Sequence, residues 1–181
     1  MRLADLARAA TTLSIEAFRS SHPEPVLVVL APKKAKAQPA TTTARSPKTQ
    51  RITLEDTGHL ALPTVAAFRP NVPLDADATV IPLKKTNRNP FASMITLGRA
   101  NNNDVLFPFN SVSKVHAYLT WTKGWTLTDQ RATNGTLVNG APLPQGGSMP
   151  LEDGACISLG PEVLLRFFLP EGFYKALRTR P

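Results

Sequence analysis

The sequence is poor in the residues that build disulfides, metal sites and catalytic centres. It has one cysteine, so it forms no disulfide within the chain, and its three histidines do not have metal-ligand spacing. It contains neither a Gly-x-Ser-x-Gly elbow nor a Gly-x-x-x-x-Gly-Lys-Ser/Thr phosphate loop. These absences argue against a zinc protein, a hydrolase with a nucleophile elbow and a P-loop NTPase. We therefore expect no catalytic residues, no metal and no cofactor.

Long hydrophobic runs are also missing. No stretch approaches the roughly 18 uninterrupted apolar residues that a membrane span needs. Arg2 and Arg8 are basic, but Asp5 and several hydroxyl residues interrupt any apolar core of a signal peptide. Cys156 lies in an alternating apolar stretch, which predicts a buried structural thiol in a reducing compartment. The sequence thus predicts a soluble, cytoplasmic protein that does not bind membranes.

Acidic residues are scarce in one region of this basic chain, whose formal net charge is +8. Residues 31–51 carry no acidic residue, several prolines and threonines, and the basic residues Lys33, Lys34, Lys36, Arg45, Lys48 and Arg51. Such a composition buries little apolar area and is typical of a flexible linker. Basic runs also bind nucleic acid, but aromatic residues are not interleaved here, so nucleic-acid binding is the less favoured interpretation.

Apolar spacing divides the chain into four parts. Apolar residues three and four positions apart predict a short amphipathic helix over residues 3–18, ended by Pro23 and Pro25. Residues 26–30 are all apolar and predict a buried strand, or an edge strand that needs a partner. The expected segments are a helix and strand over 1–30, a basic Pro/Thr-rich linker with an irregular segment over 31–77, a β-rich domain over 78–170, and a tail or short helix over 171–181.

The β-rich part consists of short apolar stretches separated by turn signals. The candidate strands cover residues 79–83, 94–97, 104–107, 117–121, 125–129, 136–138, 155–159 and 163–169. Asn-Gly, Asp-Gly and Gly-Gly pairs separate several of them. Many short strands at this spacing predict an all-β sandwich or barrel. After Pro170, residues 173–178 are expected to form a helical turn.

Three short motifs follow one another within this domain. They are Gly98-Arg99, then Ser113 to His116, then Asp129 to Gly140. Taken singly, each motif has a purely structural explanation. Asn-Gly pairs favour tight turns. An arginine after a strand is usually a solvated surface charge, and a histidine in an apolar strand is usually a core residue. Taken together, an arginine, hydroxyls and an asparagine in turns are what a phosphorylated side chain needs around it.

In this order, the motifs resemble the forkhead-associated (FHA) domain over about residues 78–169. The matching residues are Gly98, Arg99, Asp104, Ser113, His116, Ala117, Trp125, Leu127, Asp129, Asn134, Gly135, Thr136, Val138, Asn139, Gly140, Leu151, Asp153, Gly154, Ile157, Leu159 and Gly160. The resemblance implies an all-β, FHA-like β-sandwich of two antiparallel sheets with an N-terminal appendage. One departure is Ala132, where many members have a serine.

The same resemblance assigns roles to the site residues. Arg99 and Ser113 are expected to hold phosphate oxygens, Lys114 and Thr133 to add contacts, and Asn134 to hold the peptide backbone. Arginine suits this role because its planar, permanently charged fork matches a phosphate. The residues expected to support the site without contacting the ligand are Gly98, His116, Gly135, Asn139 and Gly140.

The expected function is therefore non-catalytic recognition of phosphothreonine on a partner protein, downstream of a Ser/Thr protein kinase. The alternative is a phosphate-independent scaffold that uses the sandwich face or the N-terminal segment. The chain also offers its own candidates, Thr49 and Thr53, with Ile52 and Asp56 at the third following position. If a kinase modified either threonine, it could bind to the same chain or to a second copy.

Overall fold

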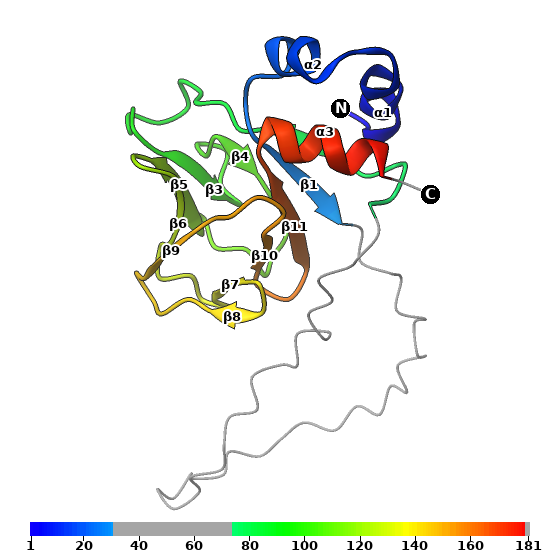
Figure 1. The fold of residues 1–181 in the computed structure, drawn as a ribbon. Helices are drawn as coiled ribbons and strands as arrows, with labels where there is room; N and C mark the ends of the chain where they lie inside the picture. Colours follow the sequence, from blue (N-terminus) through cyan, green and yellow to red (C-terminus); the bar gives the residue numbers. More distant parts are fainter. Residues whose placement is uncertain (31–73, 180–181) are drawn as a thin grey trace, which may run out of the picture.

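The computed structural model describes residues 1–30 and 74–179 of the chain. Within these residues the order of elements is α1 (Leu3–Thr12), α2 (Ile15–Ser21), β1 (Val26–Leu30), β2 (Val80–Pro82), β3 (Ile95–Gly98), β4 (Val105–Leu106), β5 (Ala117–Trp121), β6 (Trp125–Asp129), β7 (Thr136–Val138), β8 (Ala141–Pro142), β9 (Ser148–Pro150), β10 (Cys156–Leu159), β11 (Val163–Phe168) and α3 (Pro170–Arg178). Figure 1 shows the strands gathered into two facing sheets with the helices at one side.

The strands form a β-sandwich, as predicted. One sheet has the order β2-β1-β11-β10-β7-β8 and the other has the order β4-β3-β5-β6-β9. Neighbouring strands are antiparallel except for β3 and β4, which pair in parallel at the edge of the second sheet. The prediction of two antiparallel sheets is therefore confirmed with this one exception, which is confined to a two-residue edge strand.

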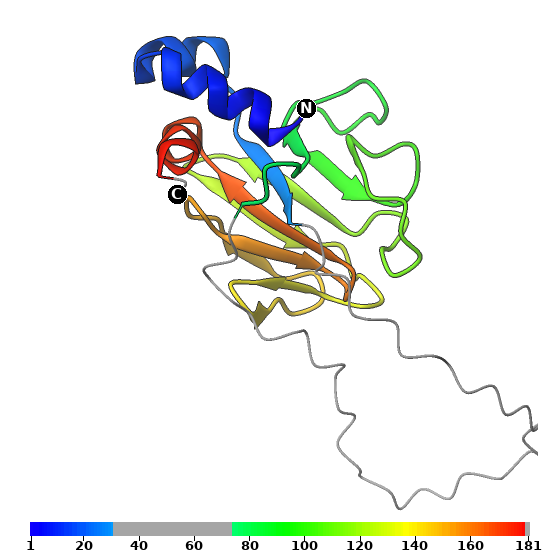
Figure 2. The same ribbon diagram turned by 90° about the vertical axis from the view of Figure 1, so that its right-hand side faces the viewer.

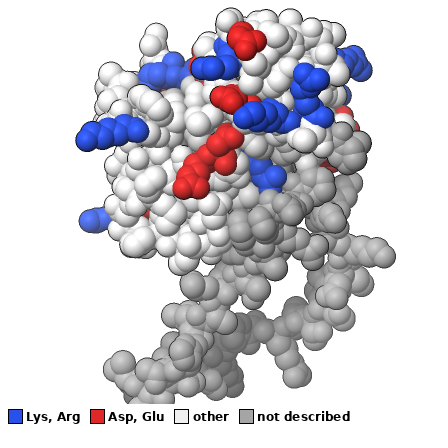
Figure 3. All heavy atoms as spheres, in the orientation of Figure 1, with Lys and Arg blue, Asp and Glu red and all other residues white. Residues whose placement is uncertain are grey.

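The helices form a third layer outside the first sheet. Figure 2 shows α1 and α3 together beside the sheet that contains β1 and β11. Each helix is anchored by a side chain that is at most 1% exposed: Leu3 in α1, Phe18 in α2 and Phe173 in α3. Where the helices lie in Figure 3, Lys and Arg side chains are interspersed with Asp and Glu, so this face carries no patch of one sign. None of the helices in the described part of the chain is long and apolar enough for a bilayer.

The prediction of one helix over residues 3–18 is wrong, because the chain forms two. α1 ends at Thr12, and the Ser14 side chain begins α2 by accepting a hydrogen bond from the Ala17 N–H at 3.3 Å. The apolar spacing runs through this break, since Leu6 and Phe18 both pack into the same cluster. Serine is a favoured N-cap residue, so Ser14 was the feature of the sequence that indicated the start of a second helix.

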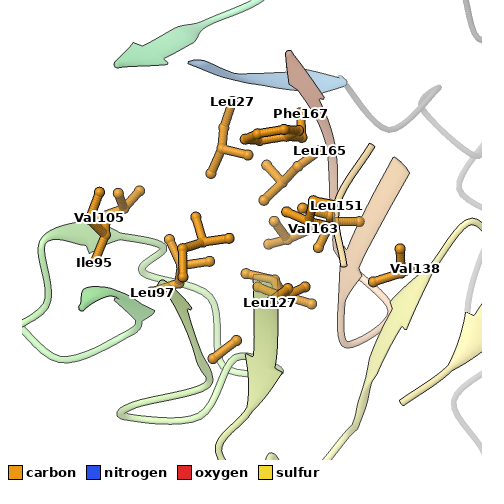
Figure 4. Packing of buried hydrophobic residues seen from close by; sticks show 14 of the residues in the cluster. Leu27, Ile95, Leu97, Val105, Leu127, Val138, Leu151, Val163, Leu165 and Phe167 are labelled. Atoms are coloured by element: carbon orange, nitrogen blue, oxygen red, sulfur yellow. The ribbon is translucent and has the colours of Figure 1, made fainter. Parts of the chain in front are cut away.

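Strand β1 is buried on both of its faces. Leu27 points into the sandwich with Phe167, opposite Leu97 and Leu127 of the second sheet (Figure 4). Val28 points the other way and packs beneath the helices. A strand covered on both faces is expected to be apolar at every position, which explains the uninterrupted Val26–Leu30 sequence.

The position of β1 joins the N-terminal segment to the sandwich. β1 lies between β2 and β11 and pairs with both. The sequence analysis counted residues 1–30 with an appendage, because the partners of β1 lie about 50 and 140 residues further along the chain. The structure instead makes these residues an inner strand and its covering layer. Residues 31–73 of the predicted linker lie outside the described residues.

The other predicted strands agree with the structure to within about two residues at each end. Two strands were not predicted, Ala141–Pro142 and Ser148–Pro150, which are short, mostly exposed and contain proline. Proline is confined to edges of sheets, and β8 and β9 are edge strands. The predicted C-terminal helical turn is a full helix that begins at Pro170, a favoured residue at the first helical position. Cys156 is buried, as predicted.

A buried carboxylate fixes the loop between β3 and β4. Asp104 accepts hydrogen bonds from Thr86, Thr96, Asn89 and Lys85, whose Nζ lies 2.9 Å from the carboxylate oxygens. Although burial opposes its ionisation, these hydrogen bonds lower the pKa of Asp104 well below its ordinary value. The ionised side chain therefore ties residues 84–89 to the loop that follows Gly98 and Arg99.

Candidate functional site

Three loops meet at one end of the sandwich and line an open depression of about 430 Å³. They are the β3–β4 loop, the β4–β5 loop and the β6–β7 loop. The lining residues are Arg99, Asn110, Ser111, Val112, Ser113, Lys114, Val115, Arg131, Thr133 and Asn134. All five residues that the sequence predicts as ligand contacts, Arg99, Ser113, Lys114, Thr133 and Asn134, are in this set, although they come from three separate loops.

Arg99 is exposed and held by its neighbours. Its Nε donates to the Val112 carbonyl at 3.1 Å, and its backbone N–H donates to the Ser113 carbonyl at 2.9 Å. No acidic side chain pairs with Arg99 within residues 1–30 and 74–179. The guanidinium is thus oriented through one nitrogen, which leaves its terminal nitrogens to bind an anion.

Gly98 lets the backbones of two site loops approach closely. A Cβ at this position would lie 2.4 Å from the Lys114 carbonyl oxygen, much closer than van der Waals contact allows. The Asn103 side chain holds the same junction, because its Nδ2 donates to the carbonyls of Ala100 at 2.7 Å and Lys114 at 2.6 Å. Only glycine fits at residue 98 without moving the loop that carries Ser113 and Lys114.

The β4–β5 and β6–β7 loops are tied together at the depression. The Thr133 N–H donates to Ser113 Oγ at 3.1 Å, and Asn134 Nδ2 donates to the Ser111 carbonyl at 2.8 Å. The Ser113 hydroxyl therefore accepts one hydrogen bond and keeps its own hydrogen to donate. The Asn134 side chain keeps its amide oxygen and one amide hydrogen. Lys114 is exposed at the rim.

His116 lies beneath the site and is completely buried. Its Nδ1 accepts a hydrogen bond from the Ser113 N–H at 3.1 Å, and its Nε2 lies 3.1 Å from the Gly135 carbonyl, to which it donates. Burial lowers the pKa of His116, although the Gly135 carbonyl and the nearby Asp129 carboxylate oppose this change. The ring is therefore neutral near pH 7, with its proton on Nε2, and it joins the two loops that carry Ser113 and Asn134.

Replacing His116 by alanine is expected to destabilise the protein by about 2–4 kcal/mol, because the change opens a cavity and removes the hydrogen-bond partner of the Ser113 N–H. In the wild-type protein, the unfolded chain binds a proton near the ordinary histidine pKa of 6.5, whereas the folded chain resists it. The free energy of unfolding should therefore fall as the pH drops from about 7.5 to about 5.5. Urea denaturation at both pH values should show a smaller fall for His116→Ala. An equal fall in both proteins would show that His116 does not contribute.

The β6–β7 loop owes its shape to buried hydrogen bonds and left-handed residues. Asp129 accepts from the Ala132 N–H at 3.0 Å and from Thr136 Oγ1 at 2.5 Å. Gly135 has φ of +69°, a conformation that favours glycine. In the following turn, Asn139 and Gly140 also have positive φ, and Asn139 Oδ1 accepts from the Cys156 N–H at 2.9 Å. These turn residues lie outside the lining of the depression.

The sequence analysis missed Arg131, which lines the same depression. It is an exposed residue in the β6–β7 loop with φ of +55°. The signal for it was its place between Asp129 and Thr133 in a motif already singled out, where a basic side chain had no structural explanation. With Arg131 included, three cationic side chains surround an open depression, an arrangement that suits a phosphorylated or otherwise anionic ligand.

Other regions offer less specific chemistry. In the part of the chain that the structure describes, no group of three or more His, Cys, Asp or Glu side chains could hold a metal ion. A larger depression of about 760 Å³ lies between α2 and the β5–β6 turn, and its lining includes Trp121, Trp125 and Pro23. None of the predicted site residues belongs to it.

Comparison with known proteins finds one sequence-family model that matches the region of this site. Residues 95–160 match the family model of the FHA domain, so the resemblance predicted from the sequence is confirmed. Over 67 residues the chain is 40% identical to the ABC transporter ATP-binding/permease protein Rv1747 of Mycobacterium tuberculosis. This match covers 36% of the chain but only 7% of the length of that relative.

A comparison with solved structures found partial similarities. The N-terminal FHA domain of Rad53p from S. cerevisiae, in complex with a phosphothreonine peptide, is 21% identical, with a TM-score of 0.44 over 54% of this chain and 89% of that domain. The Slr1951 protein from Synechocystis sp. is 18% identical, with a TM-score of 0.45 over 81% of this chain and 95% of that protein.

Proposed function

We propose that the FHA domain identified here is a non-catalytic module that binds phosphothreonine segments of partner proteins in Ser/Thr kinase signalling. The observation that supports this most directly is the convergence of Arg99, Ser113 and Asn134 from three loops on one open depression. The side chains that would face a ligand there have hydrogen-bond donors and acceptors without a partner in the described residues. The loops that carry these side chains are held in place by hydrogen bonds to one another. A preorganised site of this kind loses little conformational entropy when it binds.

Each side chain has a chemical role in this proposal. A phosphothreonine carries a charge of about −1.5 to −2 at neutral pH and presents three acceptor oxygens. The Arg99 fork and the Ser113 hydroxyl donate to those oxygens, and Lys114 adds a point charge at the rim. Thr133 offers a second hydroxyl beside them. Asn134 has both a donor and an acceptor, which match the main chain of an extended peptide.

The connection between β1 and β2 offers a candidate ligand within the chain itself. Leu30, where β1 ends, pairs with Leu164 of β11. The preceding turn carries Glu162, which accepts a hydrogen bond from the hydroxyl of Ser111 at the edge of the depression. Because Leu30 lies at the end of the sheet where the site lies, we include Thr49 and Thr53, once phosphorylated, among the proposed partners, although both lie outside the described residues.

The proposal is tested by fluorescence anisotropy with the full chain. The peptides are a degenerate library and two peptides centred on Thr49 and Thr53, each prepared with phosphothreonine, phosphoserine and unmodified threonine. We expect binding to the phosphothreonine forms, with the unmodified forms at least about 100-fold weaker, since they lack the charge that the cations require. Binding that does not depend on phosphate would refute the proposal and favour the scaffold alternative.

A further inference from the structure

Arg131 has a backbone conformation that arginine rarely adopts. Its φ is +55°, and among the described residues the only other non-glycine residue with positive φ is Asn139. Asparagine tolerates this region because its short side chain bonds locally, whereas a long side chain with a Cβ is strained there. Strained residues of this kind persist where the surrounding structure holds them, and they are concentrated at ligand sites.

The loop imposes this conformation through the neighbours of Arg131. The Gln130 N–H donates to the His116 carbonyl at 2.9 Å, and the Ala132 N–H donates to the buried carboxylate of Asp129 at 3.0 Å. The peptide group that follows Arg131 and the one that precedes Gln130 are therefore both held by hydrogen bonds. A glycine would satisfy this backbone without strain, so the backbone gives no reason for an arginine here.

The charge of the depression explains why residue 131 is an arginine. Its cations are Arg99, Lys114 and Arg131, all exposed. No acidic residue belongs to its lining, and the nearby Glu162 carboxylate, at its edge, accepts a hydrogen bond from the Ser111 hydroxyl. None of the three forms an ion pair within the described residues. Arg131 Nε lies 4.0 Å from where a Cβ on Gly146 would be, so its side chain extends along the β8–β9 turn. A phosphothreonine offers at most two negative charges, which leaves about one cation unmatched.

We propose that Arg131 is a specificity-determining residue that selects peptides with a second acidic group close to the phosphothreonine. This inference rests on the proposed function of the site. Arg99, fixed by Val112, and the adjacent Lys114 balance the first phosphate, whereas Arg131 reaches from the third loop toward the β8–β9 turn. The second group is either a carboxylate or another phosphate, because both accept two hydrogen bonds from an arginine fork.

The test compares three peptides in fluorescence anisotropy at low and moderate salt. One has a single phosphothreonine with neutral flanks, one has aspartates in the flanks, and one has a second phosphothreonine. The proteins are the wild-type chain, Arg131→Gly, Arg131→Lys and the matched surface variant Lys123→Ala, which removes an exposed charge from the β5–β6 turn. Arg131→Gly should fold at least as stably as the wild type, because glycine adopts positive φ without strain.

We expect the wild-type chain to bind at least one acidic peptide about tenfold more tightly than the neutral one, and to lose part of this preference as salt is added. Arg131→Gly should reduce the preference to about twofold with little effect on the neutral peptide. Arg131→Lys, which keeps the charge but loses the fork, should show an intermediate preference, and Lys123→Ala should keep the wild-type preference. Comparison of the two acidic peptides shows whether the second acidic group that Arg131 selects is a carboxylate or a phosphate. An unchanged preference in Arg131→Gly would overturn the inference. If the wild-type chain bound none of the three peptides, the proposed function itself would fail.

Discussion

A fragment containing residues 78–181 alone is expected not to fold, although it includes all the predicted contacts with the ligand. Removing the N-terminal residues takes β1 out of the middle of the first sheet, where it pairs with both β2 and β11. The backbone edge of β11 would be exposed, and β2 would lose β1, the one strand that it pairs with among the described residues. Unpaired edges of this kind promote aggregation.

The apolar area lost is as important as the lost pairing. Leu3, Leu6, Phe18, Leu27 and Val28 are each at most 3% exposed. At about 1.5–3 kcal/mol for each buried side chain, these five contribute roughly 8–15 kcal/mol, an upper estimate. The net stability of a whole domain is usually about 5–15 kcal/mol. The fragment therefore lacks a contribution as large as its expected stability.

The measurement is the thermal or urea unfolding of the fragment and of the full chain, followed by circular dichroism and tryptophan fluorescence. The full chain should unfold cooperatively, and the fragment should show no transition. Adding a separate peptide of residues 1–30 should restore part of the transition if β1 binds in its place. A cooperative transition for the fragment alone would show that the β1 and helix contacts are dispensable.

Replacing Arg99 by alanine is expected to weaken phosphothreonine-peptide binding by about 30-fold to several thousand-fold, with little change in stability. The large effect follows because the loss of one partner in a charge-assisted hydrogen bond leaves the phosphate charge partly uncompensated. The small change in stability follows because Arg99 is exposed, and its only side-chain hydrogen bond in the described residues is to the Val112 carbonyl.

Two controls separate the geometry of Arg99 from its charge. Arg99→Lys keeps the charge but loses the fork, so its affinity should fall between those of the wild type and Arg99→Ala. Lys123→Ala removes an equivalent positive charge far from the depression and should bind like the wild type. Anisotropy titrations at one fixed salt concentration measure all four proteins. Wild-type affinity in Arg99→Ala would contradict the proposed role of this residue.

The candidate site was predictable to a large extent because its residues occur in short local motifs. Asn134 and Gly135 fit a tight turn by their own chemistry, and Gly98 precedes Arg99 at the end of a strand. The order of such motifs is readable in one sequence, although the convergence of three loops on one depression is not. Arg131 was missed because a single basic residue in a turn is ordinarily a solvated surface charge, although it lies within the motif; its place in the lining of the depression is visible in the structure.

The fold was less predictable where it depends on distant contacts. The apolar run Val26–Leu30 indicated a buried strand, but its partners β2 and β11 could not be inferred from spacing. Pairing over such separations is decided by tertiary packing, not by local propensity. The break between α1 and α2 was hidden for a related reason, since both helices bury their apolar residues in one cluster.

The pairing of β1 with β2 has a consequence for how this chain can vary in length. These neighbouring strands run antiparallel, and Val28 faces Val80, so the two ends of the intervening connection leave the sheet about one strand spacing apart. The entropy of closing a loop grows only with the logarithm of its length, and each doubling costs about 0.6 kcal/mol. Insertions and deletions between these two strands should therefore be nearly neutral for the sandwich, which leaves that stretch free to diversify while the core stays constant.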